Sequence, residues 1–338
     1  MKDKVYIRAD GGPEIGLGHL VRCMALAQML KSEFSIHFFT KEIPPNLSND
    51  IISQGFLLNR ISSENDFFSF LTGKEIVVLD HYDFSVNYQK QIKSKGSKLV
   101  CIDDLHDKEF VADLIINHSP GINMRDYKAQ PYTSFALGPR YALLRPVFLE
   151  AAKNKKVTRQ IKTVMICFGG SDYKNMTKKV LEVVKEIKNF QKITVVLGAA
   201  NPHLCTFDDL QLNDNRIEIF SALNEEQMCT LMMSTDLAIV PSSGILFEVV
   251  AAGCIPLTCY YADNQRKLFR FIEKNSGIPT FNGFGYIRDE LTSSINKVIN
   301  NLNAYNFIPM REEIEKSPYN NRNIFKILKE ELVKKDTI

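Results

Sequence analysis

The sequence predicts an α/β protein made of two Rossmann-like, doubly wound domains that face a central cleft. The chain has 338 residues, which is more than one hydrophobic core usually organises. Short, continuously apolar runs alternate with helical patterns, as expected for parallel strands covered by helices on both faces. Because this alternation occurs twice, we expect ligands to bind where the carboxyl ends of the two sets of strands face one another.

The first domain is expected to span residues 1–155. A helix is predicted to begin near His19, after the first strand and a glycine-rich loop, and further helices lie between the later strands. The apolar runs that we assign to buried parallel strands are 5–10, 34–40, 75–82, 98–104 and 113–119.

The second domain is expected to span residues 156–308, because residues 138–162 become helical and basic before a new apolar run begins. Helices are predicted after Asp172, from Glu225 and around Phe247. Residues 309–338 are helical in pattern and rich in charge, as in REEIEK and NIFKILKEELVKK, and predict amphipathic helices that pack back onto the body. The strands of this domain are predicted at 163–170, 192–198, 216–223, 236–244 and 255–261.

Composition excludes several classes of protein. The 42 basic and 39 acidic residues nearly balance, so the chain lacks the field of a dedicated nucleic-acid binder. No stretch has the roughly 18 apolar residues of a membrane-spanning helix, and the start lacks the apolar core of a signal peptide. The seven cysteines are scattered without CxxC pairs, which indicates a reducing compartment and therefore the cytoplasm.

The loop RADGGPEIGLGH at residues 8–19 is the sharpest local signal. Its glycines, including Gly16 and Gly18, permit close approach of a ligand to the backbone, and a helix begins directly after it. A histidine that titrates near neutrality can take a proton from water or a hydroxyl, so His19 is a candidate base. Asp10 or Glu14 is the candidate partner carboxylate. The alternatives are that His19 is a capping or buried structural histidine and that Asp10 caps the turn.

The spacing of the loop argues against two common nucleotide motifs. Val21 stands where the third glycine of GxGxxG would fall, and no GK[ST] ending follows the glycines. The dinucleotide and ATP interpretations are weakened accordingly.

Two turns of the second half join a strand to a helix and carry glycine and serine, whose backbone N–H groups can hold a phosphate. Two such turns can share a diphosphate without a metal, and an acid one helical turn further on can accept the ribose hydroxyls. Each turn alone is equally explained by the need to end a strand and cap a helix, and the acid by the helix dipole. The candidates are Gly169, Gly170, Ser171, Ser242, Ser243 and Gly244, with Glu248 as the acid.

Taken in order, the motifs RADGGPEIGLGHLVRC, LDHY, IDDL, GPRYALLRP, GGSD and SSGILFE resemble those of the pseudaminic acid pathway hydrolases. The resemblance covers roughly residues 5–275 and implies a GT-B fold related to the MurG-type glycosyltransferases. It also implies release of UDP from UDP-2,4-diacetamido-2,4,6-trideoxy-β-L-altropyranose, by attack of water at the anomeric carbon with inversion. We expect a monomer that uses no cofactor.

The resemblance also implies roles for individual residues. His19 would activate the water, Asp10 matches the RAD motif, and Glu248 would bind the ribose. Tyr82 of LDHY, with Asn264 and Gln265 of ADNQ, would contact the substrate.

No metal is expected. The adjacent acids Asp103 with Asp104, and Asp208 with Asp209, are interpreted as turn acids rather than as a DxD metal site.

Two other functions stay open. A glycosyltransferase of the same fold would use His19 to deprotonate an acceptor hydroxyl instead of water, and fold alone does not separate the two reactions. A protein that binds a nucleotide sugar without catalysis would keep the turns of the second half but would not need the complete histidine loop.

Overall fold

The computed structural model describes residues 2–12, 15–154, 156, 158–198, 201–203, 207, 214–302 and 307–318. The chain divides into two compact units. Unit 1 contains the described residues up to Pro146 and those from Lys316 on, and unit 2 contains Val147–Glu315. The domain limits expected at 155 and 308, and the cleft between the domains, stay predictions.

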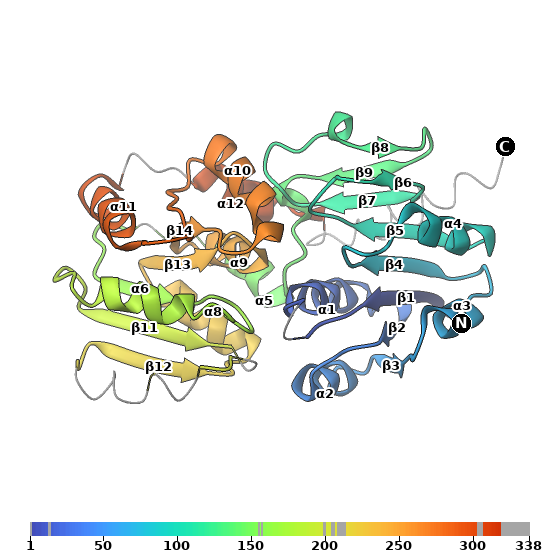
Figure 1. Cartoon of the computed structure of the whole chain (residues 1–338), viewed down its shortest axis with the longest axis horizontal. Coiled ribbons are helices and arrows are strands. Elements are labelled where there is room, and N and C mark those ends of the chain that lie inside the picture. The colour runs from blue at the N-terminus through green and yellow to red at the C-terminus, as the bar shows by residue number, and fades with distance from the viewer. Residues whose placement is uncertain are drawn as a thin grey trace. The chain divides into compact units, whose positions relative to one another are not determined.

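Unit 1 is built on a seven-stranded sheet in the order β3-β2-β1-β4-β5-β7-β9, in which all neighbours pair in parallel. From β1 at the centre, the chain adds strands first on one side (β2, β3) and then on the other (β4, β5, β7, β9), which is the topology of a doubly wound sheet (Figure 1). The strands are β1 (Asp3–Ala9), β2 (Phe34–Thr40), β3 (Leu57–Arg60), β4 (Ile76–Asp80), β5 (Lys98–Ile102), β7 (Leu114–Asn117) and β9 (Ser134–Leu137). A separate two-stranded sheet joins β6 (Glu109–Phe110) and β8 (Lys128–Ala129).

Helix α1 packs on β1 and β2, and α4 packs on β5. The face that α1 turns to the sheet carries buried apolar residues such as Leu20, Leu26 and Leu30, so burial of this face stabilises the helix against the strands. The helices of unit 1 are α1 (Gly18–Leu30), α2 (Pro45–Ser53), α3 (Glu64–Ser69) and α4 (Val86–Ser94), with 3-10 turns at Met124–Asp126 and Pro139–Tyr141.

Unit 2 holds a five-stranded parallel sheet in the order β12-β11-β10-β13-β14. Its three central strands are buried along most of their length, which explains their continuous apolar sequences. The strands are β10 (Thr163–Ile166), β11 (Lys192–Leu197), β12 (Ile217–Ser221), β13 (Leu237–Pro241) and β14 (Ile255–Cys259).

The helices of unit 2 cover this sheet. Helix α6 packs on β10, β11 and α11, whereas α9 packs on β13, β14 and α12. The helices are α5 (Pro146–Ala151, which starts at the change of unit), α6 (Met176–Val184), α8 (Glu225–Ser234), α9 (Gly244–Ala251), α10 (Arg266–Asn275), α11 (Arg288–Asn300) and α12 (Ile308–Glu315), with a 3-10 turn at Asp263–Gln265. The prediction of helices over 309–338 lies partly outside the described residues, since these end at 318.

The predicted fold class, two doubly wound α/β units, is confirmed, and each strand expected from an apolar run is present. Four strands were missed: β6 and β8, which form the separate two-stranded sheet, and β3 and β9, which form the two edges of the sheet of unit 1. The edge strand β3 has two exposed and two partly buried residues. Its sequence therefore lacks the continuous apolar run that identifies the central strands.

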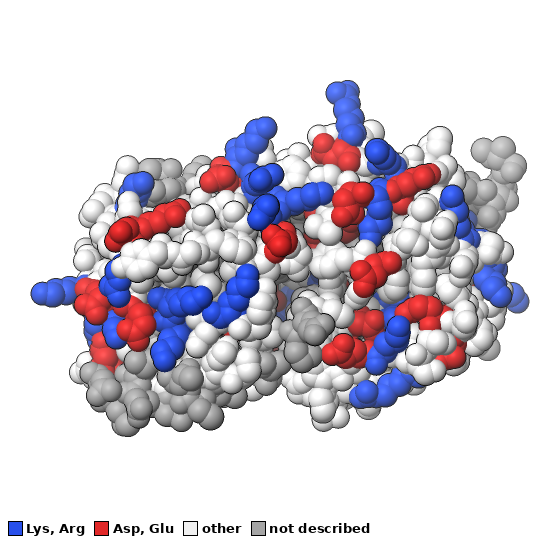
Figure 2. Space-filling model, viewed as in Figure 1, with Lys and Arg blue, Asp and Glu red and all other residues white. Residues whose placement is uncertain are grey.

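The described helices include none that is both long and apolar enough to cross a bilayer. On the face drawn in Figure 2, basic and acidic side chains are interleaved rather than gathered by sign.

Candidate functional site

Several polar side chains of unit 1 lie together at the carboxyl ends of the strands of its sheet. The strands are parallel, so their carboxyl ends meet at the same edge. There Asp80 ends β4, Asp104 follows β5 and His118 follows β7. Helix α1 begins at this edge with Gly18, which places His19 in its first turn.

His19 is held by Asp80. Its Nδ1 lies 2.7 Å from Asp80 Oδ1, and both side chains are buried, with 5 % and 0 % exposed. A carboxylate can only accept, so Nδ1 of His19 carries the hydrogen and Nε2 of the neutral ring keeps a lone pair. The rings of Tyr82 and His19 pack edge to face, with ring centroids 4.7 Å apart. This geometry suits His19 to accept a proton through Nε2.

Arg22, one turn along α1 from His19, locks the carboxylate in place. Its Nε and Nη2 donate to the two oxygens of Asp80 at 2.6 Å each, a bidentate pair that fixes both the position and the plane of the acid. Its Nη1 donates to both oxygens of Asp104 at 2.8 and 2.7 Å. One guanidinium therefore joins β4 and the end of β5 to the helix that carries His19.

The charge of Asp80 persists in this buried position. Burial alone raises the pKa of an acid, but here the charge of Arg22, the interaction with His19 and the hydrogen bonds outweigh burial and hold the pKa of Asp80 well below its ordinary value. Asp80 is therefore ionised throughout the neutral range and can stabilise a proton on His19.

Asp10, the partner expected for His19 from the loop, is engaged elsewhere. Its Oδ2 lies 2.8 Å from Arg8 Nη2, and its Oδ1 accepts from the backbone N–H groups of Lys41 and Glu42 at 2.6 and 3.2 Å. The carboxylate beside His19 is Asp80, so the assignment of Asp10 as that partner is corrected. The other candidate, Glu14, lies outside the described residues.

The glycines of the loop have distinct roles. Gly16 has φ of +81°, a conformation that favours glycine, and it exchanges two backbone hydrogen bonds with Gly12 at 2.8 and 3.2 Å. A β-carbon on Gly18 would meet no atom within 4 Å, so the backbone there is open beside the start of α1. Their contact with a ligand stays a prediction.

His118 is the other buried titratable group of this edge. Burial lowers the pKa of His118 to about 4. The negative charge of Asp104 raises this pKa but only partly offsets the effect of burial. The unfolded chain protonates a histidine near about pH 6.5. The neutral ring therefore contributes stability that is present above about pH 6.5 and is lost as the pH falls towards 4, by about 3 kcal/mol for this group alone.

Replacing His118 by asparagine is expected to flatten the fall in the free energy of unfolding over this acid range. Urea titrations at several pH values measure the slope, and His37→Asn, at a position that is only partly buried, serves as the control. An unchanged slope in His118→Asn would mean that His118 has the same pKa in the folded and the unfolded protein, which would contradict the prediction.

In unit 2, the turn after β10 carries Gly169, Gly170 and Ser171. Gly169 has φ of +81°, and no N–H of the three donates a hydrogen bond to another described residue. The turn lies so close to the end of β11 that a β-carbon on Gly198 would come within 2.3 Å of Gly170 O. Asp172 caps α6 by accepting from the N–H groups of Met176 and Thr177 at 2.7 and 2.9 Å.

The turn after β13 differs from the expectation at one residue. Ser242 is buried, and its hydroxyl lies 3.0 Å from that of Thr258, so this side chain faces the interior. Ser243 precedes α9 without capping it by its side chain, and Gly244 begins the helix. Glu248 lies one turn further on and is 7 % exposed. Substrate contacts by these residues stay predictions.

Gln265 has a structural role in its own loop. Its Oε1 accepts from the N–H of Tyr261 at 3.0 Å, and the hydroxyl of Tyr261 donates to Phe168 O at 3.2 Å, next to the turn after β10. Asn264 lies in the same 3-10 turn. Contact of Asn264 and Gln265 with the substrate stays a prediction, and no local sequence pattern indicates the link to the glycine turn.

No group of three or more His, Cys, Asp or Glu side chains that could hold a metal occurs in the part of the chain that the structure describes. Asp104 pairs with Arg22, and Asp103 accepts from the N–H of His106 and the hydroxyl of Tyr127. Asp103 therefore holds the turn after β5, whereas Asp104 links this turn to α1 through Arg22. Asp208 and Asp209 lie outside the described residues.

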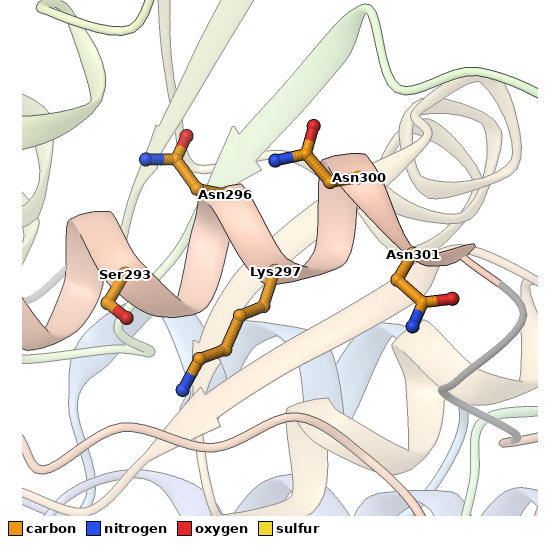
Figure 3. A pocket seen from close by; sticks show the side chains of 5 residues that line it. All are labelled: Ser293, Asn296, Lys297, Asn300 and Asn301. Carbon is orange, nitrogen blue, oxygen red and sulfur yellow. The ribbon is translucent and has the colours of Figure 1, made fainter.

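A hollow of about 550 Å³ lies apart from these turns, on helix α11 of unit 2. Figure 3 shows that its side chains leave the helix in different directions and do not converge on one point. It is lined by Ser293, Asn296, Lys297, Asn300 and Asn301. Nothing in this arrangement resembles a built binding site.

Comparison with curated proteins confirms the resemblance drawn from the motifs. The chain is 26 % identical over 278 residues to the UDP-2,4-diacetamido-2,4,6-trideoxy-β-L-altropyranose hydrolase of Campylobacter jejuni, covering 80 % of this chain and 96 % of that protein. It is 27 % identical over 280 residues to the spore coat polysaccharide biosynthesis protein SpsG of Bacillus subtilis, covering 77 % and 78 %. An uncharacterised protein of Methanocaldococcus jannaschii is 27 % identical over 281 residues, which are 79 % of this chain but only 57 % of that protein. No family model matches the chain.

Solved structures confirm the GT-B fold. Acinetobacter baumannii MurG superposes with a TM-score of 0.64 at 10 % identity, over 96 % of this chain and 99 % of that chain. Anabaena HepE in complex with UDP superposes with a TM-score of 0.59 at 11 % identity, over 98 % and 100 %. At these identities the likeness establishes the fold alone.

Proposed function

We propose that the protein is a nucleotide-sugar enzyme that hydrolyses a UDP-activated amino sugar and releases UDP. The substrate we propose is UDP-2,4-diacetamido-2,4,6-trideoxy-β-L-altropyranose, in pseudaminic acid or related nonulosonic acid biosynthesis. The Campylobacter relative, which bears the name of this hydrolase, supports the choice of substrate. The observation that carries the reaction type is the pairing of His19 with Asp80 at the carboxyl edge of the unit 1 sheet.

The mechanism follows from the hydrogen bond between these two residues. Asp80 accepts from Nδ1 of His19, which leaves Nε2 to take a proton from water as the water attacks the anomeric carbon. The sugar C–O bond breaks on the opposite face, UDP leaves with its electron pair, and the anomeric centre inverts. Asp80 stabilises the imidazolium, and Arg22 keeps Asp80 in position.

The departing diphosphate is proposed to bind unit 2. Gly169, Gly170 and Ser171 offer N–H groups that make no hydrogen bond to another described residue, and α9 begins at Gly244 after Ser243. Backbone donors and a helix N-terminus stabilise negative charge as it develops on a leaving group. Glu248, one turn into α9, is proposed to accept hydrogen bonds from the ribose.

We place this reaction in the cytoplasm and propose that the protein acts as a monomer. The cysteines that the structure describes are all buried free thiols, which suits a reducing compartment.

The test of this function is UDP release from the proposed substrate without an acceptor, with and without EDTA. We expect release that EDTA leaves unchanged, since the proposal uses no metal. Release only after addition of an acceptor would identify a glycosyltransferase, a reaction that fold alone does not separate from hydrolysis. Binding of the nucleotide sugar without any turnover would identify a binding protein.

A further inference from the structure

His81 lies at the candidate site but has no role in the mechanism so far. It directly follows Asp80 at the end of β4, and its ring centroid is 5.7 Å from that of His19. Its side chain is nine-tenths buried, with 10 % exposed. A titratable ring in this position, next to the proposed base, needs a physical explanation.

The hydrogen bonds of His81 determine where its proton sits. The backbone N–H of Asp83 donates to Nδ1 at 3.1 Å, so Nδ1 carries a lone pair and the neutral ring holds its hydrogen on Nε2. The carboxylate of Asp83 is 3.6 Å from Nδ1, too far for a hydrogen bond. Burial lowers the pKa of His81, and the nearby His19 lowers it further, so the neutral ring prevails at neutral pH.

The Nε2–H of His81 is a buried donor without an acceptor in the described part of the protein. Buried polar groups are almost always hydrogen-bonded, because an unpaired donor loses its water without compensation. An exception beside a candidate base indicates that a bound group supplies the missing acceptor.

We propose that His81 is a further ligand-binding residue of the site, whose Nε2–H donates a hydrogen bond to an oxygen bound next to His19. The inference rests on the proposed function, in which this oxygen belongs either to the attacking water or to the sugar. A donor to the attacking water holds it in place while His19 takes its proton. A donor to a sugar oxygen aligns the anomeric carbon with that water.

Two substitutions separate this role from a structural one. His81→Phe keeps the ring but removes both nitrogens, whereas His81→Gln retains an N–H near the position of Nε2. We expect kcat/KM of His81→Phe to fall by about 10-fold to 100-fold, as for loss of a single buried hydrogen bond. We expect His81→Gln to recover most of this loss.

The form of the loss identifies the acceptor. A lower kcat at unchanged KM assigns the hydrogen bond to the attacking water, and a higher KM assigns it to the sugar. Wild-type kcat/KM in a folded His81→Phe would overturn the proposal, as would a His81→Gln that folds like the wild type but recovers nothing.

A second measurement keeps the proposal testable if the wild type does not release UDP. Long-range ¹H–¹⁵N spectra of the free protein report the tautomer of each histidine, and the signal of His81 is assigned by its disappearance in His81→Gln. The Nε2–H tautomer is expected at neutral pH. The Nδ1–H tautomer would overturn the proposal whatever the activity of the enzyme.

Discussion

Replacing His19 by asparagine is expected to lower kcat for UDP release by about 10²-fold to 10⁴-fold, the usual contribution of a general base. Asparagine is polar and fits the first turn of α1, but its amide does not accept a proton at neutral pH. Steady-state assays of UDP release measure the effect. KM is expected to change little, because the base acts on the water rather than on the sugar.

His37→Asn is the matched control for this substitution. His37 lies on β2 of the same sheet, is only partly buried and lies 3.2 Å from the hydroxyl of Ser35. The control should retain wild-type kcat. A His19→Asn protein that folds and still turns over at the wild-type rate would remove His19 from the mechanism.

Replacing Asp80 by asparagine is the other substitution with a large expected effect. The new amide N–H₂ can donate to Nδ1 of His19, which would move the ring hydrogen to Nε2 and block proton acceptance there. We expect kcat to fall by about 10³-fold. The bidentate pair with Arg22 is also lost, so stability should fall by about 3 kcal/mol, as when one partner of a buried ion pair is removed.

Asp10→Asn is the control that decides which carboxylate assists His19: Asp10, as the sequence motif suggested, or Asp80, as the structure indicates. Asp10 is also buried and paired with an arginine, Arg8, but its oxygens contact Arg8 and two backbone N–H groups rather than His19. It should lose stability, as seen by urea unfolding, with a loss of kcat below about 10-fold, since no general base is affected. A large loss in Asp10→Asn together with full activity in Asp80→Asn would restore the sequence-based assignment.

The parts of the fold that the sequence predicted are those with strong burial. Strands such as β4 and β13 are covered on both faces and read as continuous apolar runs. The missed strands β3 and β9 are held at the edges by backbone pairing with one neighbour. Backbone pairing leaves little mark on the choice of side chains, so the sequence gives no clear signal for such strands.

Only those parts of the candidate site that lie within one short sequence motif could be predicted. A glycine-rich loop before a helix identifies His19 within one short segment. Asp80 lies 61 positions away, and only the parallel pairing of β1 with β4 brings the two together. The motif LDHY includes Asp80, but only Tyr82 was selected from it as a candidate. A carboxylate at the end of a predicted strand that neighbours the first strand is the signal that would have found Asp80.

The same limit applies to the polar candidates of unit 2, whose substrate contacts stay predictions. Ser242 and Gln265 carry side chains typical of ligand contacts, yet Ser242 meets Thr258 and Gln265 holds the N–H of Tyr261. Whether a polar side chain points inward depends on the neighbouring strand or loop, which a local motif does not contain. The requirement for glycine at position 198 was also not predicted. It arises because the turn at Gly170 leaves no room for a β-carbon, and that turn is distant in the sequence.

The central claim is that water attacks the sugar carbon, with UDP as the leaving group. The most direct test runs the reaction in H₂¹⁸O and locates the label by mass spectrometry of both products, sampled early because a free anomeric hydroxyl exchanges slowly with water. The account predicts that the label enters the anomeric hydroxyl of the sugar and that UDP stays unlabelled. Label in the β-phosphate of UDP would mean attack at phosphorus and would contradict the mechanism.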